Sequence, residues 1–287
     1  RWIVRSRIIP HLGESMITDL DPIKMQAYYE FMLKQGSSAH QVRTIHKVLR
    51  VSLNHAVKLH LIASNPCTGT TPPKPKHNEM KFFDEQQVKV LLETALEIED
   101  RFHPLYYIAI HTGMRISEIM GLKWDDLDWE QRTLRVQRQV KHFKGESYTF
   151  EKPKSRSGNR TIILGSTAIE VLQDQKDYVD TLKAEGEQEW TELDLIFPSR
   201  VGTPLTSSNI RRGFRRRLKA SGLPKIRFHD LRHTAATLML NHGIPVLVAS
   251  RRLGHSKPSI TMDVYGHLLP SKQQEAADLL DSLISPD

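Results

Sequence analysis

The segment "RFHDLRHTAATLMLNHG", residues 227–243, predicts a helix that ends at a glycine. Within it, His229 and Arg232 are three residues apart and share one helix face. A guanidinium binds phosphate oxygens in bidentate fashion, and a nearby imidazole adds a hydrogen-bond donor. His229 and His233 also have a zinc-site spacing, but Asp230 follows the first histidine and no third ligand is evident. We therefore interpret the segment as a phosphate-binding helix and expect no metal.

A small antiparallel β-sheet is predicted in the middle of an otherwise helical chain. The strings "TLRVQRQV", "SYTF" and "NRTIIL" are short and rich in β-branched residues, and turn-forming segments separate them. Before them, Asp84 and Gln87 form a capping box for one helix, and a second helix over about 102–111 ends near Gly113. From Thr167 onward the patterns are helical. The predicted fold class is mainly α with a small antiparallel β-sheet, in two domains.

A proline-rich linker divides the chain. Residues 64–80, "SNPCTGTTPPKPKHNEM", hold four prolines and show no hydrophobic period. Ahead of the linker, the sequence predicts two capped helices over 21–36 and 37–62. We therefore expect one domain over residues 1–75 and a second over residues 80–287.

Positive charge is concentrated near the N-terminus. The chain has a formal net charge of +8 and a pI near 9.5. Residues 1–75 alone hold 10 lysines and arginines against 4 acidic residues. Their second helix carries a basic stripe of Arg43, Lys47 and Arg50. No acidic residue lies between Glu30 and Glu79 to pair with this basic stripe, which favours contact with a polyanion.

The composition also indicates in which cellular compartment the protein is expected. The one cysteine, Cys67, excludes an internal disulfide framework and fits a reducing cytosol. No apolar run approaches the ~18 residues needed to cross a membrane, and the first residues lack the apolar core of a signal peptide. We expect a cytoplasmic protein that does not contact a membrane.

Two further motifs carry groups that suit a phosphodiester. In "HTGMRISE", one helix ends at a glycine and another follows, which presents Arg115 at a helix start. Glu118 falls on the same face and could orient the arginine or a neighbouring histidine. The turn in "EKPKSRSGNRTIIL" carries four cations, and a lysine there could protonate a departing alkoxide. Spacing alone does not decide which one; the four are Lys152, Lys154, Arg156 and Arg160.

The stretch "LGHSKPSITMDVYGHL", residues 253–268, places Tyr265 ten residues after His255. A tyrosine hydroxyl has a pKa near 10 and must lose its proton to attack. Arginine and histidine side chains nearby would stabilise both the phenolate and a pentavalent phosphorane. A tyrosine in isolation is more often a packing residue, but the accompanying motifs favour a nucleophile.

The order and spacing of these residues resemble the tyrosine recombinase (phage integrase) family. "HTGMRISEI" is similar to its first arginine box, "HDLRHT" to its His-x-x-Arg box, and "LGHS" with the later tyrosine to its nucleophile box. Glu118 agrees with the acidic accessory residue of the family. The motifs cover about residues 80–287, and residues 1–75 look like the helical core DNA-binding domain. The catalytic set implied by the resemblance is Arg115, Lys154, His229, Arg232, His255 and Tyr265.

The resemblance implies a mechanism that needs neither metal nor cofactor. Tyr265 attacks a scissile phosphate, which gives a 3′-phosphotyrosyl link and a free 5′-hydroxyl. The two arginines hold the non-bridging oxygens, and Lys154 protonates the 5′-oxygen. His229 serves in acid–base or donor roles, and His255 hydrogen-bonds the phosphate. The 5′-hydroxyl of a partner strand then reverses the reaction.

The resemblance also implies partners. These are double-stranded DNA at specific attachment sites, a homotetramer on DNA, and accessory DNA-bending or directionality proteins, all at the nucleoid. The helix over 271–284 would dock on a neighbouring protomer or pack on its own domain, and the two alternatives stay open. The start at Arg1 fits a longer chain with an N-terminal arm-binding domain. The candidate DNA-binding residues are Arg43, Lys47, Arg50, Arg211, Arg212 and Arg215.

The sequence therefore predicts a site-specific recombinase that integrates or excises a phage or conjugative element. One alternative is a type IB topoisomerase-like enzyme, which uses similar groups without pairing two sites. Another is a DNA-binding regulatory protein without catalysis. The complete catalytic set argues against the second alternative, because simple binding does not require it.

Overall fold

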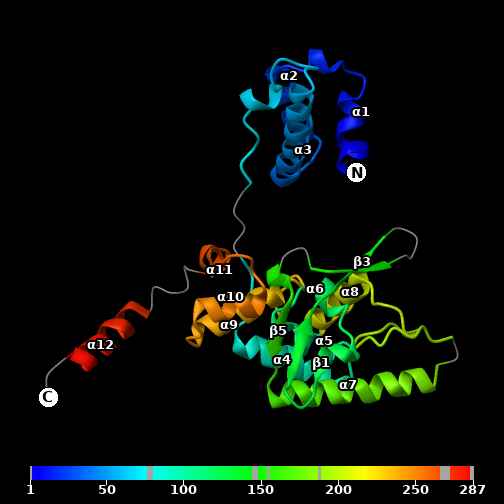
Figure 1. The fold of residues 1–287 in the computed structure, drawn as a ribbon, viewed down its shortest axis with the longest axis vertical. Helices are drawn as coiled ribbons and strands as arrows, with labels where there is room; N and C mark the ends of the chain where they lie inside the picture. The colour runs from blue at the N-terminus through cyan, green and yellow to red at the C-terminus, as the bar shows by residue number, and fades with distance from the viewer. Residues whose placement is uncertain are drawn as a thin grey trace. The chain divides into compact units, whose positions relative to one another are not determined.

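The computed structural model describes residues 2–75, 80–143, 148–153, 156–186, 189–265 and 272–284. The contacts divide the chain into two compact units, Arg1–Glu79 and Met80–Asp287, called unit 1 and unit 2 below (Figure 1). Among the described residues, no helix combines the length and the hydrophobicity needed to cross a bilayer.

Unit 1 is built around two helices, α2 (Pro22–Lys34) and α3 (Ala39–Lys58). Asp21 caps α2 by accepting a hydrogen bond of 2.7 Å from the N–H of Lys24, and Ser38 forms a reciprocal capping box at the start of α3. Both predicted helices are confirmed. Shorter turns flank them: η1 (Val4–Ile8), α1 (Ile9–Leu12), η2 (Ile17–Asp19) and η3 (Pro66–Gly69).

Helix α3 has a buried face and a basic face. Its predicted core positions are all buried: Val42, Ile45, Leu49, Leu53 and Ala56. They face Met25, Tyr29 and Met32 of α2, which belong to the same core cluster. Burying each valine, leucine, isoleucine or methionine side chain among them stabilises the unit by about 1.5–3 kcal/mol. The basic stripe lies on the exposed face.

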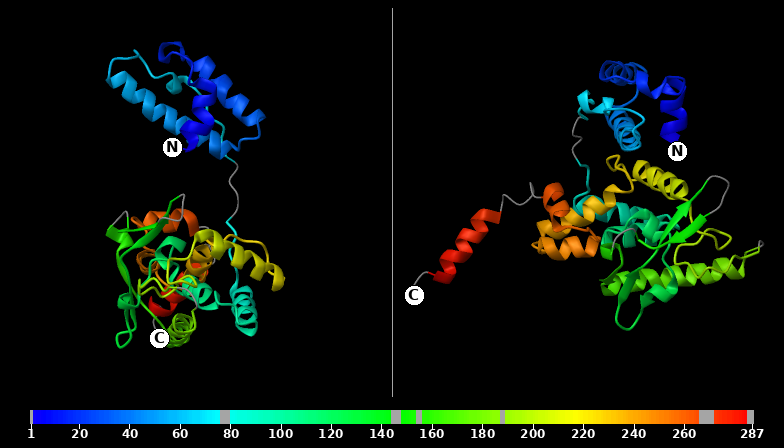
Figure 2. Two further views of the ribbon diagram at one scale, coloured as in Figure 1. Left: turned by 90° about the vertical axis from the view of Figure 1, so that its right-hand side faces the viewer. Right: turned by 45° about the horizontal axis from the view of Figure 1, so that its top comes forward.

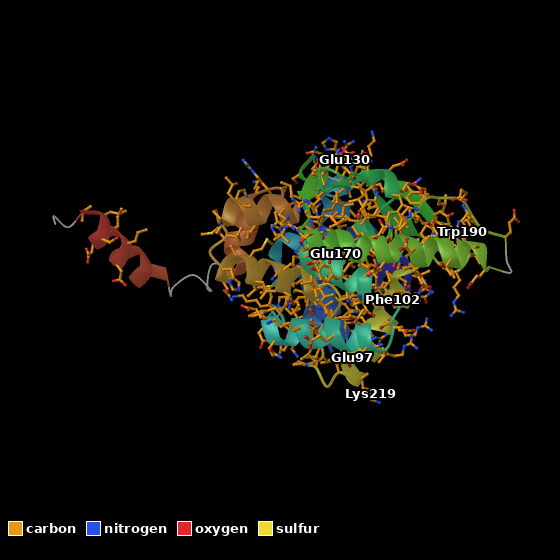
Figure 3. The ribbon with its side chains drawn as sticks, turned by 90° about the horizontal axis from the view of Figure 1, so that it is seen from below. Glu97, Phe102, Glu130, Glu170, Trp190 and Lys219 are labelled. Atoms are coloured by element: carbon orange, nitrogen blue, oxygen red, sulfur yellow. The ribbon has the colours of Figure 1, made fainter. Side chains whose placement is uncertain are left out.

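Helix α5 (His103–Thr112) lies at the centre of unit 2. It contacts α4 (Glu85–Glu97), α6 (Ile116–Ile119), α7 (Ser166–Ala184) and α9 (Asp230–Asn241). Seen from below, α4 and α7 are marked by Glu97 and Glu170 (Figure 3). The predicted Asp84–Gln87 box caps α4, and Phe83 and Val88 both join the core, as expected for a hydrophobic staple.

The strands form two antiparallel sheets in the described part of the chain, where the sequence predicted one. The first has the order β1 (Leu127–Asp128), β2 (Thr133–Val136) and β5 (Arg160–Ile163). The second pairs β3 (Gln139–His142) with β4 (Tyr148–Glu151). The string "TLRVQRQV" therefore spans two strands, because the chain leaves the first sheet between Val136 and Gln139. The short turns η4 (Trp124–Asp126) and η5 (Arg156–Gly158) precede β1 and β5.

The C-terminal part is helical, as predicted. It comprises α7, α8 (Ser207–Ala220), α9, α10 (Val246–Leu253), α11 (Pro258–Tyr265) and α12 (Lys272–Ile284). Helix α10 contacts α9, α11 and β5, and these helices lie together in both views of Figure 2. This arrangement brings the ends of α5 and α10 to one place.

Candidate active site

The candidate site lies where α5 and α10 end. Both helices stop at glycines in the left-handed region, Gly113 with φ 64° and Gly254 with φ 74°. A Cβ at Gly113 would overlap the Leu253 side chain, so the helix ends approach each other closely only because this residue is glycine. The residues that follow the two glycines carry the chemistry.

Arg115 is the N-cap of α6, which confirms the prediction that it stands at a helix start. Its side chain is 40% exposed, and its Nη1 donates a hydrogen bond of 2.7 Å to Glu118 Oε1. The backbone N–H of Arg115 donates to the other carboxylate oxygen of Glu118 at 3.0 Å. Helix α6 is a single turn, shorter than the sequence suggested. Glu118 thus orients the arginine, which decides between the two partners that spacing had left open.

Glu118 is a buried carboxylate held between two arginines. Arg160 Nη2 reaches its second oxygen at 3.1 Å, and the carboxylate side chain is only 3% exposed. Burial alone would raise the pKa of Glu118, but Arg160 and the hydrogen bonds from Arg115 outweigh burial and lower the pKa. Glu118 therefore stays charged and keeps Arg115 in place.

Arg232 is buried in α9 and bonded to both helix ends. Its Nη1 donates to the carbonyl of Gly113 at 2.8 Å and to that of Leu253 at 2.7 Å. The last carbonyls of a helix lack partners within the helix, so a guanidinium there satisfies them and fixes its own position. The structure thus brings Arg232 to the turn that carries Arg115.

His255 follows directly on the glycine that ends α10. Its N–H donates to the carbonyl of Ser250 at 3.1 Å, and its Nδ1 lies 2.7 Å from Thr261 Oγ1 of α11. Desolvation first, and then the charges of Arg232 and Arg115, lower the pKa of His255 to about 4. The imidazole is neutral at neutral pH and lies within the electrostatic reach of both predicted arginines.

His229 and His233 form a pair at the start of α9. Their rings meet edge to face with centroids 5.6 Å apart. Desolvation and the charges of His233 and Arg232 lower the pKa of His229 to about 4. His229 is nonetheless exposed to solvent, so a ligand can reach it.

Two predicted residues fall outside what the structure describes. Lys154 lies outside the described residues. Tyr265 is the last residue of α11, one helical turn after Thr261, and its side chain lies outside the described part. The roles of both remain predictions.

The structure adds Arg160, which the sequence identifies only as one of the four turn cations. Its side chain is 7% exposed. In β5 it shares a sheet face with the buried Ile162, because Arg160 pairs with Val136 and Ile162 with the buried Leu134. That two-residue alternation is readable in "NRTIIL" and is the signal that would have placed Arg160 inside the protein.

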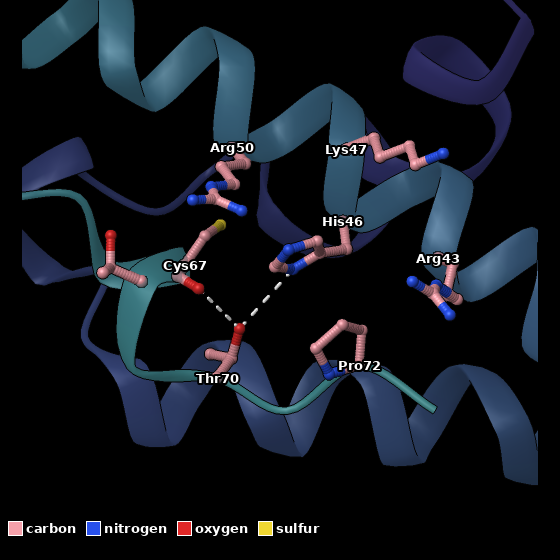
Figure 4. Close-up of a pocket in the computed structure, with 8 residues that line it drawn as sticks. Arg43, His46, Lys47, Arg50, Cys67, Thr70 and Pro72 are labelled. Carbon is pink, nitrogen blue, oxygen red and sulfur yellow. Dashed lines mark hydrogen bonds between the residues drawn. The ribbon is translucent and has the colours of Figure 1, made fainter. Parts of the chain in front are cut away.

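The basic stripe of unit 1 borders a cavity of about 270 Å³ (Figure 4). Arg43, Lys47 and Arg50 line it with His46 and residues of η3 and the following segment. Burial, followed by the charges of Arg50 and Arg43, lowers the pKa of His46. The cavity is therefore cationic at its rim, which suits an anionic group.

Helix α8 presents the other predicted cations. Arg211, Arg212 and Arg215 are exposed, as a polyanion contact would require. Arg217 of the same helix is instead buried, and its Nη2 bonds Asp100 at 2.9 Å. The helix thus has a structural arginine inside and a basic surface outside.

Comparison with known proteins identifies the family. Residues 81–272 match the model of the phage integrase family. The chain is 31% identical over 284 residues to a tyrosine recombinase XerC-like protein of Caldanaerobacter subterraneus subsp. tengcongensis, and the match covers 93% of this chain and 72% of that protein. It is 26% identical over 284 residues to the ICEBs1 integrase of Bacillus subtilis, with 99% of this chain and 77% of the relative covered.

Solved structures agree on the fold. The Tn1549 transposon integrase in complex with a circular intermediate DNA has a TM-score of 0.81 at 21% identity, with 96% of this chain and 92% of that chain covered. A lambda integrase dimer bound to a COC′ core site has a TM-score of 0.61 at 21% identity, with 86% and 65% covered. The predicted fold class, mainly α with small antiparallel sheet structure, is confirmed. The chain belongs to the phage integrase family of tyrosine recombinases, and it is a site-specific recombinase that breaks and rejoins DNA strands.

Proposed function

We propose that this recombinase integrates and excises a phage or conjugative element through a covalent 3′-phosphotyrosyl intermediate, with Tyr265 as the nucleophile. One observation carries the proposal. Arg115, Arg232 and His255 converge on the adjoining ends of α5 and α10, in a chain whose α11 ends at this tyrosine.

The arginines would bind the non-bridging oxygens of the scissile phosphate. Arg115 offers an exposed guanidinium that Glu118 orients, and Arg232 is fixed by two carbonyls. Donors that are already in place stabilise charge as it develops on the phosphorane, because the protein does not have to reorganise during the reaction. This is the physical basis for assigning them to the transition state.

The neutral His255 suits a hydrogen-bond donor to phosphate. If the Thr261 hydroxyl donates to Nδ1, the single ring proton is on Nε2, which can then donate to a phosphate oxygen. A pKa of about 4 keeps the imidazole neutral before DNA arrives. Thr261 would thus set the donor side of the catalytic imidazole.

The chemical step conserves the number of phosphodiester bonds. The Tyr265 oxygen forms a bond to phosphorus while the bond from phosphorus to the 5′-oxygen breaks. The leaving 5′-oxygen takes a proton from Lys154, and the neutral His229 accepts the tyrosine proton. Attack by the 5′-hydroxyl of a second strand reverses these events, so the proposal includes no metal or cofactor.

The proposed partners follow from the substrate. Double-stranded DNA would meet the basic stripe of unit 1 and the exposed arginines of α8. The Tn1549 and lambda integrases were solved on DNA, which supports this assignment. We propose a homotetramer that pairs two sites, assisted by DNA-bending or directionality proteins. Because chromosomal DNA is the substrate, the protein would act at the nucleoid.

A nicked suicide duplex tests the proposed function. Loss of the short strand after cleavage traps the intermediate, so the wild type should form a protein–DNA adduct visible on a denaturing gel. Tyr265→Phe removes only the nucleophilic oxygen and should abolish the adduct while DNA affinity stays within about twofold. An adduct from the phenylalanine variant would exclude Tyr265 as the nucleophile.

A duplex with two sites separates the recombinase from a topoisomerase-like enzyme. Recombination exchanges the flanking DNA between sites, whereas relaxation of supercoils without exchange would favour the topoisomerase-like alternative.

A further inference from the structure

We propose that Arg160 is a positioning residue for strand cleavage: it fixes the end of α10, and with it His255, against the carboxylate that orients Arg115. The proposal rests on the proposed function, because it gives Arg160 a part in the same cleavage step.

Arg160 bonds three acceptors from one buried position in β5. Its Nε donates to the carbonyl of Arg252 at 2.7 Å, its Nη2 to Glu118 Oε2 at 3.1 Å, and its Nη1 to the carbonyl of Gly158 at 3.2 Å. The planar fork of a guanidinium allows these bonds at the same time, which an ammonium group cannot reproduce. Arg160 therefore joins the α6 side of the site to the α10 side.

The end of α10 is capped by two arginines from outside the helix. Arg160 holds the carbonyl of Arg252, and Arg232 holds the next carbonyl, that of Leu253. Each arginine also reaches the turn between α5 and α6, Arg160 through Glu118 and Arg232 through the carbonyl of Gly113. His255 lies two residues after Leu253, so its backbone position depends on the hydrogen bonds from both arginines.

Gly254 shows how close this contact is. A Cβ at Gly254 would lie 2.8 Å from Arg160 Nη1 and 2.9 Å from the carbonyl oxygen of Ser157. The backbone just before His255 therefore runs against the Arg160 guanidinium. Moving or shortening that guanidinium leaves space beneath the turn that presents His255.

The ion pair with Glu118 alone is a weaker explanation for an arginine at this buried position. Burying a salt bridge costs desolvation, and well-packed apolar residues in its place are often as stable. The position lies on the buried sheet face beside Ile162, where an aliphatic side chain would fit the strand pattern. A charged residue that also holds the Arg252 carbonyl is better explained by placement of the site.

The first test compares cleavage with DNA binding. We expect Arg160→Gln to slow adduct formation on the suicide duplex by about 100-fold, as misplacement by about 1 Å of a catalytic group does. The dissociation constant for the same duplex should change less than threefold, because the Arg160 side chain is only 7% exposed. Arg135→Gln is the matched control, since Arg135 lies on neighbouring β2 and is exposed. It should cleave at the wild-type rate.

Arg160→Lys covers the case in which the glutamine variant fails to fold. The lysine keeps a positive charge beside Glu118 but reaches fewer acceptors, so we expect cleavage about tenfold slower than wild type with unchanged affinity. The double variant Glu118→Gln with Arg160→Gln removes both buried charges. It should remain slow, because it lacks both the bond to the Arg252 carbonyl and the carboxylate that holds Arg115.

The second test measures the pKa of His255 in the DNA-free protein. The charged and titratable groups near its ring are Arg115, Arg160, Arg232 and His233. Removing Arg160 removes one charge that lowers the pKa of His255, so the pKa should rise in Arg160→Gln and stay constant in Arg135→Gln. Titration of the histidine Cε1–H signals by NMR measures it, with His255→Gln used to assign the signal. A general loss of stability would not produce this local shift.

Two results would overturn the proposal. One is adduct formation at the wild-type rate by Arg160→Gln or Arg160→Lys. The other is a loss of cleavage that matches an equal loss of DNA affinity while the pKa of His255 stays unchanged, which would make Arg160 a structural residue. If neither the wild type nor Arg135→Gln forms an adduct, the proposed function itself fails and the role of Arg160 falls with it.

Discussion

At the scale of single residues, arginine serves the site as a binder of backbone carbonyls as much as a binder of charge. Arg232 bonds two carbonyls, Arg160 bonds two carbonyls and a carboxylate, and Arg252 bonds the carbonyls of His111 and Ile163. Five donors spread over a planar group make this possible, whereas the three donors of lysine are all on one nitrogen. Arg-to-Lys exchanges at these positions are therefore not conservative.

Histidines give the folded protein a pH dependence. The pKa values of His111, His229 and His255 are all lowered to about 4, with desolvation as the largest cause. An unfolded histidine titrates near 6.5, so between pH 6.5 and 4 the unfolded chain binds more protons than the folded one. The free energy of unfolding should therefore be highest above pH 6.5 and fall as the pH drops toward 4.

Urea unfolding at pH 7.5, 6.5, 5.5 and 4.5 measures this dependence. The variant His255→Gln should lose part of the slope, because His255 is one of the three groups whose lowered pKa causes it. Stability that is flat or rises on acidification over this range would contradict the prediction.

At the scale of elements, the sequence predicted the helix ends correctly where the capping residues lie within one turn of the end they cap. The caps at Asp21, Ser38 and Asp84 and the glycine that ends α5 depend on side chains within one turn, and all are confirmed. The division of the strands into two sheets depends on which distant segments pair, so the sequence could not decide it. The site residues followed from motifs, but the bond from Arg160 to the Arg252 carbonyl joins residues 92 positions apart, and no spacing rule reveals it.

The basic stripe of α3 supports a prediction about DNA affinity. Arg43→Ala combined with Lys47→Ala should weaken duplex binding and lower the slope of log affinity against log salt by about 2, because each phosphate contact releases close to one counterion. Lys24→Ala with Lys34→Ala removes the same charge from exposed positions of α2 and should change the slope less. Fluorescence anisotropy at several salt concentrations measures both. Equal slopes in the two double variants would indicate that the basic stripe faces solvent and does not contact DNA phosphates.

At the scale of the whole molecule, each unit has its own hydrophobic core, and α12 carries an exposed apolar surface. Unit 1 and unit 2 each bury their own hydrophobic cluster. In α12, Leu279, Leu280 and Leu283 are more than half exposed, and so is Ile284. An amphipathic helix with such a surface is suited to burial against protein. This exposure favours docking on a neighbouring protomer over packing on its own domain, and we propose that contact.

Assembly should depend on α12, while strand cleavage should not. Leu279→Ser with Leu283→Ser should raise the protein concentration needed for tetramers on paired sites by about tenfold or more, because burying a leucine contributes about 1.5–3 kcal/mol. Asp281→Ser in the same helix is the control. Mass photometry on DNA with two sites counts the assemblies, and unchanged tetramer formation in the leucine variant would exclude the contact.

The two glycine-terminated helices restrict where this chain can accept extra residues. One residue inserted into α5 would turn all that follows by about 100° about the helix axis, and Glu118, together with the Arg115 that it holds, would leave the reach of Arg160. An insertion in α10 would do the same to His255 and Thr261. Tags, reporter domains and natural insertions should therefore be tolerated at the exposed end of α7, around residues 184–186, while the lengths of α5 and α10 are fixed by the chemistry that follows them.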